Sequence, residues 1–137
     1  MYETVDHTGD LALRIRSDSF PELVAEGIRG LGSLLFEGAP SVEATETETV
    51  RVSGIDPEDL LVQALSEALY WMQSEGRFPL GVGVHMVGPS ALEIQLRGVV
   101  ADGRSCRMAQ EIKAVTYHAL TILETDRGLE TVVVLDV

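Results

Sequence analysis

Apolar residues in the first half of the chain recur with two periods, that of a strand and that of a helix. Residues 11–16 alternate apolar and polar side chains, the period of a strand with one face on a core. Residues 2–5 predict a shorter strand before it. A helix start follows, because Ser19 precedes a proline and is followed three residues later by Glu22. An apolar stripe then predicts a helix that ends near Phe36.

A second helix is predicted after an acidic, threonine-rich connection. Residues 41–48 have little to bury and indicate an exposed loop, which leads into a strand at residues 49–53. Asp56 is suited to cap a helix, with proline at the first helical position and acidic residues near the positive end of the helix dipole. The apolar stripe continues to about Glu75, and Gly76 closes the helix.

The remaining residues have the pattern of strands only. The predicted strands cover residues 81–87, 91–97, 111–122 and 129–136, and residues 98–108 are interpreted as a mobile loop. Residues 111–122 are expected to form an internal strand. The order is strand, helix, strand, helix and then consecutive strands. This order predicts an α+β fold of one domain over residues 1–137, with two helices covering one face of a mostly antiparallel sheet.

Charge and composition exclude several classes of protein. The 137 residues include 22 acidic and 10 basic side chains, a net charge of −12, which disfavours direct binding to nucleic acid. The one cysteine cannot form an internal disulfide, and no apolar run is long enough to span a membrane. The first residues lack the features of a signal peptide. These observations predict a soluble, cytoplasmic protein without membrane contact.

The single lysine is the first candidate for chemistry. All other basic side chains are arginine, so Lys113 suggests a position that requires a compact ammonium group. Such a group needs acidic companions, and Asp10, Asp136 and the α-carboxylate of Val137 are candidates near the chain ends. Three converging carboxylates would need either a cation or the protonation of one of them, and in the first case oxygen ligands select calcium or magnesium. The spacing in the sequence does not establish that the two ends meet.

Other reactive side chains lack a catalytic pattern. His7 could be a metal ligand or proton carrier, but no second histidine or cysteine stands at zinc-ligand spacing. His118 is open to two interpretations, a structural hydrogen-bonding histidine or a catalytic base. Cys106 carries no nucleophile signature, and no glycine-rich phosphate loop occurs. The pattern therefore predicts no catalytic residue.

Four segments together resemble the archease family. They are residues 6–10 (DHTGD), residues 57–62 with Leu69-Tyr70, residues 111–118 (EIKAVTYH) and the terminal Val-Leu-Asp-Val. The resemblance implies a two-layer α+β fold with a strand-helix-strand-strand unit. It also implies a protein cofactor that activates the GTP-dependent tRNA-splicing RNA ligase by promoting guanylylation and multiple turnover.

The resemblance assigns roles to particular residues. It implies a divalent cation, expected to be calcium, bound by Asp10, Asp136 and Val137, and a functional Lys113 beside them. His7 and His118 are further candidates for supporting residues, which the resemblance does not assign. Two departures stand out, because Gly9 replaces a common alanine and Cys106-Arg107-Met108 replaces a histidine-containing stretch.

Two other functions remain open at this point. One is a chaperone or specificity modulator of RNA-modifying enzymes such as tRNA methyltransferases. The other is a stand-alone metal-dependent hydrolase that uses the same acids with Lys113 as an electrophile.

Overall fold

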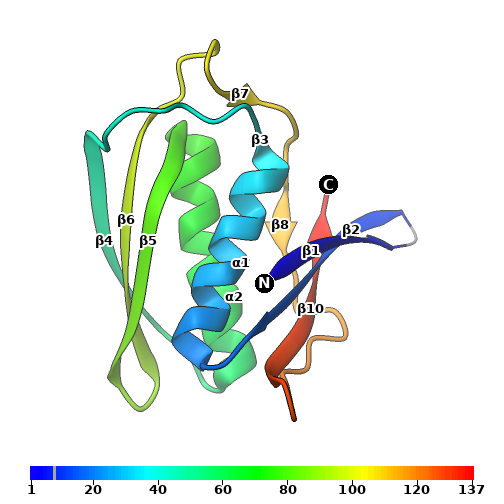
Figure 1. Ribbon diagram of the computed structural model, residues 1–137. Coiled ribbons are helices and arrows are strands. Elements are labelled where there is room, and N and C mark those ends of the chain that lie inside the picture. Colours follow the sequence, from blue (N-terminus) through cyan, green and yellow to red (C-terminus); the bar gives the residue numbers. More distant parts are fainter. Residues whose placement is uncertain (8) are drawn as a thin grey trace.

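Two helices lie between two antiparallel sheets (Figure 1). The computed structural model describes residues 1–7 and 9–137, and of Asp6 and His7 it describes the main chain only. Helix α1 spans Phe20–Leu35 and helix α2 spans Pro57–Leu69, followed by one turn of π-helix at Tyr70–Ser74. Every strand pair in the described part of the chain is antiparallel.

The main sheet joins the two ends of the chain. Its order is β1 (Tyr2–His7), β2 (Asp10–Ser17), β10 (Gly128–Asp136) and β8 (Ala114–Val115). Strand β9 (Leu123–Thr125) also pairs with β10. N-terminal and C-terminal segments are therefore hydrogen-bonded neighbours.

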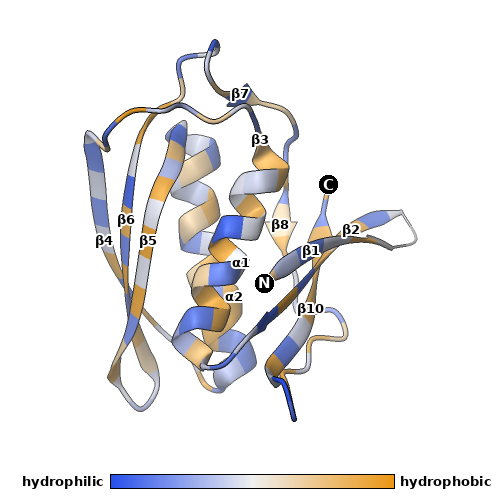
Figure 2. Ribbon diagram, in the orientation of Figure 1, coloured by the Kyte–Doolittle hydropathy of each residue, from blue (hydrophilic) through white to orange (hydrophobic). Residues whose placement is uncertain are grey.

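The second sheet contains the middle of the chain. Its order is β4 (Glu46–Ser53), β6 (Ala91–Val100) and β5 (Arg77–Gly88). Hydrophobic and hydrophilic residues alternate along these strands (Figure 2), as expected when one face packs on helices. Leu92, Ile94, Leu96 and Val99 are the buried hydrophobic residues of β6. A two-stranded pair, β3 (Phe36–Glu37) with β7 (Arg107–Met108), lies apart from both sheets.

Helix α1 approaches both sheets closely through glycines. A Cβ atom at Gly30 would lie 2.6 Å from Leu13 Cδ2 of β2, and one at Gly32 would lie 2.9 Å from Pro79 Cγ of β5. No side chain fits at such distances without a shift of the neighbouring atoms. The two glycines therefore let one helix pack on strands from different sheets.

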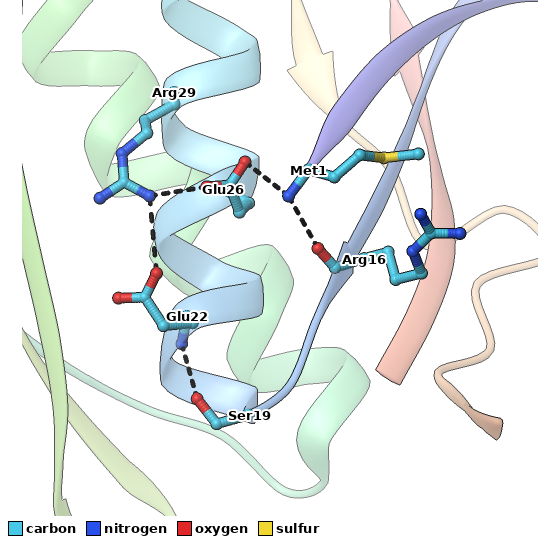
Figure 3. Close-up of polar contacts among 6 residues, drawn as sticks. All are labelled: Met1, Arg16, Ser19, Glu22, Glu26 and Arg29. Carbon is cyan, nitrogen blue, oxygen red and sulfur yellow. Dashed lines mark hydrogen bonds and ion pairs between the residues drawn. The ribbon is translucent and has the colours of Figure 1, made fainter. Parts of the chain in front are cut away.

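Both predicted helix starts are present. Ser19 Oγ accepts a hydrogen bond of 3.3 Å from Glu22 N, and Asp56 Oδ1 accepts one of 2.7 Å from Asp59 N. Figure 3 shows the first of these caps beside the ammonium group of Met1, which contacts Glu26 Oε2 at 2.9 Å. This ion pair ties the start of β1 to α1. Gly76, with φ of +67°, follows the second helix as expected.

The expected α+β class is confirmed, and β4-α2-β5-β6 forms a strand-helix-strand-strand unit. The structure adds that the strands form separate sheets on both sides of the helices. Several predicted bounds were too narrow, since β4 begins at Glu46, β5 begins at Arg77 and β6 reaches Val100. The predicted loop at 98–108 contains the short strand β7.

The prediction of an internal strand at residues 111–122 is wrong. Only Ala114–Val115 pairs as a strand, and it lies at the edge of the main sheet. A turn follows, in which Leu120 N donates to Tyr117 O at 3.1 Å and Ala119 has φ of 51°. The apolar pattern of this segment reflects burial of Ile112 and Val115 rather than continuous strand pairing.

Candidate functional site

Pairing of β2 with β10 brings Asp10 and Asp136 to one end of the main sheet. Leu11 pairs with Leu135 in this antiparallel ladder. Asp10 precedes Leu11 and Asp136 follows Leu135, so both aspartates adjoin the last pair of this ladder and would be opposed if the same register continued by one step. Residues at opposed positions have Cβ atoms about 5 Å apart and side chains on the same face. Sequence spacing could not reveal this proximity.

Lys113 lies at the same end of the sheet, next to the third strand. Asp136 pairs with Ala114, and the main-chain amide of Lys113 donates to the main-chain oxygen of Asp136 at 2.7 Å. The Lys113 side chain is exposed, and none of the residues that the structure describes forms an ion pair with it. Its ammonium group therefore faces solvent beside the strand that ends in Asp136.

The donor atoms at this end of the sheet are oxygens, the type of ligand that a hard cation such as calcium binds. Among the side chains that the structure describes, those of residues 1–5 and 9–137, no group of three His, Cys, Asp or Glu is suited to a metal. The candidate cation ligands are the side-chain carboxylates of Asp10 and Asp136 and, as a third donor, the α-carboxylate of Val137. All three supply oxygen, the ligand that calcium and magnesium prefer. Asp136 and Val137 are exposed and Asp10 is half-buried, so solvent reaches the set.

The segment that carries Lys113 is held along α2 by several polar contacts. Gln73 makes two hydrogen bonds to the main chain of Ile112, each 2.8 Å long. The Tyr117 hydroxyl donates to Asp59 Oδ1 at 2.6 Å, and Ile122 N donates to Glu58 Oε2 at 2.9 Å. The contacts to this segment therefore extend from the first turn of α2 to the π-helical turn that follows the helix.

Sequence reasoning missed this polar side of α2. Asp59, Gln63, Ser66, Tyr70 and Gln73 recur at spacings of four and three residues, which sets them in one row along a helix. Such a row opposite an apolar stripe is normally read as a solvated face. Here it contacts a chain segment that has few strand partners of its own.

The contact between Asp59 and Tyr117 changes the pKa of both groups. The pKa of Asp59 is lowered, chiefly because the Tyr117 hydroxyl donates to it, and also by hydrogen bonds from Ile55 N and the Gln63 side chain. The pKa of Tyr117 is raised, chiefly by the same hydrogen bond to Asp59. The pair therefore favours an ionised Asp59 and a neutral Tyr117.

The remaining candidate residues are His7, His118 and Cys106. The His7 side chain lies outside the described residues, although its main chain pairs with Asp10. His118 is exposed, and its main-chain amide donates to Thr116 Oγ1 at 3.3 Å. Cys106 is buried, and this burial raises the pKa of its thiol. A buried thiol with a raised pKa is a poor nucleophile, in agreement with the sequence interpretation.

The loop around Asp102 and Arg107 is held by its own contacts. Asp102 Oδ1 accepts from Arg104 N at 2.7 Å and from Ser105 N at 2.9 Å. Arg107 Nη2 lies 2.8 Å from Glu37 Oε2, across the pair of β3 with β7. These contacts belong to the part of the fold around β3 and β7 and not to the sheet end with Asp136.

A search for helices that could span a membrane found none within the described residues.

Comparison with known proteins gives one consistent result. The model of the archease protein family matches residues 2–137. The archease of Methanosarcina barkeri is 26% identical over 140 residues, covering 99% of this chain and 95% of that protein. The archease of Danio rerio is 28% identical over 139 residues, covering 99% and 85%.

Two solved structures share the fold. An archease from Thermotoga maritima, described as a possible chaperone, has a TM-score of 0.68 and 25% identity, covering 100% of this chain and 98% of that one. A protein of Methanobacterium thermoautotrophicum, with a TM-score of 0.75 and 22% identity, covers 99% and 98%. The second likeness concerns the fold alone.

Proposed function

This chain belongs to the archease family, and from that premise we propose that it is an accessory protein that activates a GTP-dependent tRNA-splicing RNA ligase. It promotes guanylylation of the ligase and allows each ligase molecule to act repeatedly. The observation that carries the proposal is the meeting of Asp10, Asp136 and the Lys113 segment at one end of the main sheet. The chain acts in the cytoplasm as a protein cofactor without a catalytic residue of its own.

In this proposal the acids of the sheet end hold a divalent cation, calcium in the first instance. Asp10, Asp136 and the Val137 carboxylate would be its ligands, with His7 and His118 as supporting residues. When bound, the cation would neutralise the repulsion among these carboxylates and add positive charge at the sheet end. The support is the donor chemistry, since every proposed ligand atom in the set of three is an oxygen.

Lys113 supplies a second positive charge near that end. Its exposed ammonium can approach a carboxylate or phosphate of the ligase complex as a compact charge. The rest of the chain is acidic, with a net charge of −12, which favours association with a basic, RNA-handling partner over direct contact with RNA. The partner in this proposal is therefore the ligase protein itself.

A turnover assay tests the proposal. Purified ligase at limiting concentration is supplied with GTP and RNA ends, with and without this protein, and joined RNA is counted per ligase molecule. We expect more than one joining event per ligase only when this protein is present. A ligase that remains at one event or fewer with the protein added would contradict the proposal.

A second function is a chaperone or specificity modulator of RNA-modifying enzymes such as tRNA methyltransferases. The observation in its favour is the description of the Thermotoga maritima relative as a possible chaperone. This function needs neither a metal nor Lys113. A change in the product pattern of a tRNA methyltransferase that persists in Lys113→Ala would favour it.

A further inference from the structure

One peptide unit next to Lys113 is held at both of its ends. The carbonyl oxygen of Ile112 accepts a hydrogen bond of 2.8 Å from Gln73 Nε2. The amide of Lys113, which belongs to the same peptide unit, donates to Asp136 O at 2.7 Å. Because a peptide unit is planar, these two bonds together determine how its plane is oriented. The plane in turn sets the direction in which the Lys113 side chain leaves the backbone.

Gln73 makes a second bond that completes the contact. Its Oε1 accepts from the amide of Ile112 at 2.8 Å, so one carboxamide pairs with both polar groups of that residue. This is the pairing that a neighbouring strand would supply, and Gln73 supplies it where the segment precedes the edge strand β8. Ile112 is fully buried, so its main-chain groups need such partners.

The turn that carries Gln73 is anchored in the core. It lies in the turn of π-helix that follows α2, and the two residues before it, Trp71 and Met72, are buried in the core. π-helical turns occur frequently at functional sites. Gln73 is therefore carried by a turn with buried neighbours and not by a mobile loop.

We propose that Gln73 is the positioning residue for Lys113. It orients the Ile112–Lys113 peptide unit against Asp136 and so directs the ammonium group relative to the end of the sheet. The link runs from Gln73 through one peptide unit to Asp136, which connects the π-helical turn to the strand with the candidate metal ligands. The role in activation rests on the proposed function, whereas the orientation of the peptide unit does not.

The direct test replaces Gln73 with leucine, which has a similar size and no hydrogen-bonding group. Gln63→Leu is the matched control, because Gln63 lies in the same helical row and contacts Tyr117 instead. Amide hydrogen exchange, followed residue by residue, should become about tenfold faster at Ile112 and Lys113 in Gln73→Leu, the factor expected for one lost hydrogen bond. Unchanged exchange at both amides would overturn the proposal.

Activation of the ligase provides the second readout. The guanylylation rate of a tRNA-splicing ligase should fall about tenfold with Gln73→Leu and stay unchanged with Gln63→Leu. In a Lys113→Ala background, Gln73→Leu should add no further loss, because its effect passes through Lys113. An additive loss in the double variant, or an equal loss with Gln63→Leu, would overturn the positioning role.

Gln73→Glu separates the two halves of the contact. A carboxylate can still accept from the Ile112 amide but cannot donate to the Ile112 carbonyl. We expect slow exchange at Ile112 to be retained, faster exchange at Lys113 and loss of activation. Wild-type activation by this variant would contradict the proposal. If Lys113→Ala itself activates the ligase normally, Lys113 has no role in activation although the proposed function stands, and the exchange data alone then decide whether Gln73 orients the peptide unit.

Discussion

The main-chain amide of Lys113 donates a hydrogen bond of 2.7 Å to the main-chain oxygen of Asp136. The two residues come from distant parts of the sequence, and Asp136 in turn continues the pairing of β10 with the strand that begins at Asp10. The segment that carries Lys113, the N-terminal Asp10 and the C-terminal Asp136 thus lie at the same end of the main sheet. This arrangement makes each proposed role open to separate tests.

Removal of the Lys113 side chain should separate stability from activation. Lys113 is exposed, so Lys113→Ala should change the free energy of unfolding by no more than about 0.5 kcal/mol, the usual range for surface substitutions. Ligase guanylylation should fall sharply. Lys113→Arg should also be impaired, because a planar guanidinium replaces the compact ammonium. Arg127→Ala, which removes another exposed cation, is the control, and equal activation by all variants would exclude a role for Lys113.

Calcium should stabilise the folded protein if Asp10, Asp136 and Val137 bind it. A ligand that binds only the folded state at 100 times its dissociation constant adds about 2.7 kcal/mol, which raises the melting temperature. Asp10→Asn and Asp136→Asn should abolish the rise, and an extension after Val137 should weaken it by converting the carboxylate to an amide. Asp126→Asn, at an exposed turn, is the control. The same rise in wild type and both variants would disprove this ligand set.

The contact between Tyr117 and Asp59 should stabilise the fold over a defined pH range. The pKa of Asp59 is lowered, chiefly by the Tyr117 hydroxyl, so this stabilisation is present above the ordinary value of about 3.9 and is lost as the pH falls through the lower folded-state pKa. The pKa of Tyr117 is raised, chiefly by Asp59, so the stabilisation persists below about pH 10 and is lost as the pH rises through the raised pKa.

Tyr117→Phe tests this contact through melting temperatures at several pH values. The variant should melt below wild type at pH 7, and the difference should shrink in strong acid, where Asp59 is protonated. Tyr2→Phe, at a second surface tyrosine, should show no such pH-dependent difference. A constant difference from pH 2 to pH 7 would mean that the hydroxyl does not act through Asp59.

Gly9→Ala should destabilise the hairpin that leads into Asp10. Gly9 has φ of +73°, where a side chain costs about 1 to 2 kcal/mol. A glycine at this position therefore suits this backbone. Gly88→Ala is the control, since a Cβ there would meet its nearest neighbour, Ala91, at 4.0 Å. Chemical denaturation measures both variants, and equal stability of Gly9→Ala and wild type would contradict the explanation.

Local patterns in the sequence were sufficient to predict the helices and strands whose formation depends on neighbouring residues. Ser19 and Asp56 cap helices through contacts only three residues long, so their effect is visible in the chain itself. Residues 11–16 alternate because β2 has one buried face, and this too is a local property. From these elements the α+β class could be predicted before any coordinates were known.

Tertiary structure decided which elements meet. The pairing of β2 with β10 sets Asp10 near Asp136, and no local pattern encodes that choice of partner. Residues 111–122 have the apolar period of a strand, but Gln73 and Glu58 of the helical segment bond to main-chain groups that a neighbouring strand would otherwise pair. Periodicity reports which side chains are buried, whereas the source of the backbone hydrogen bonds depends on contacts between residues far apart in the chain.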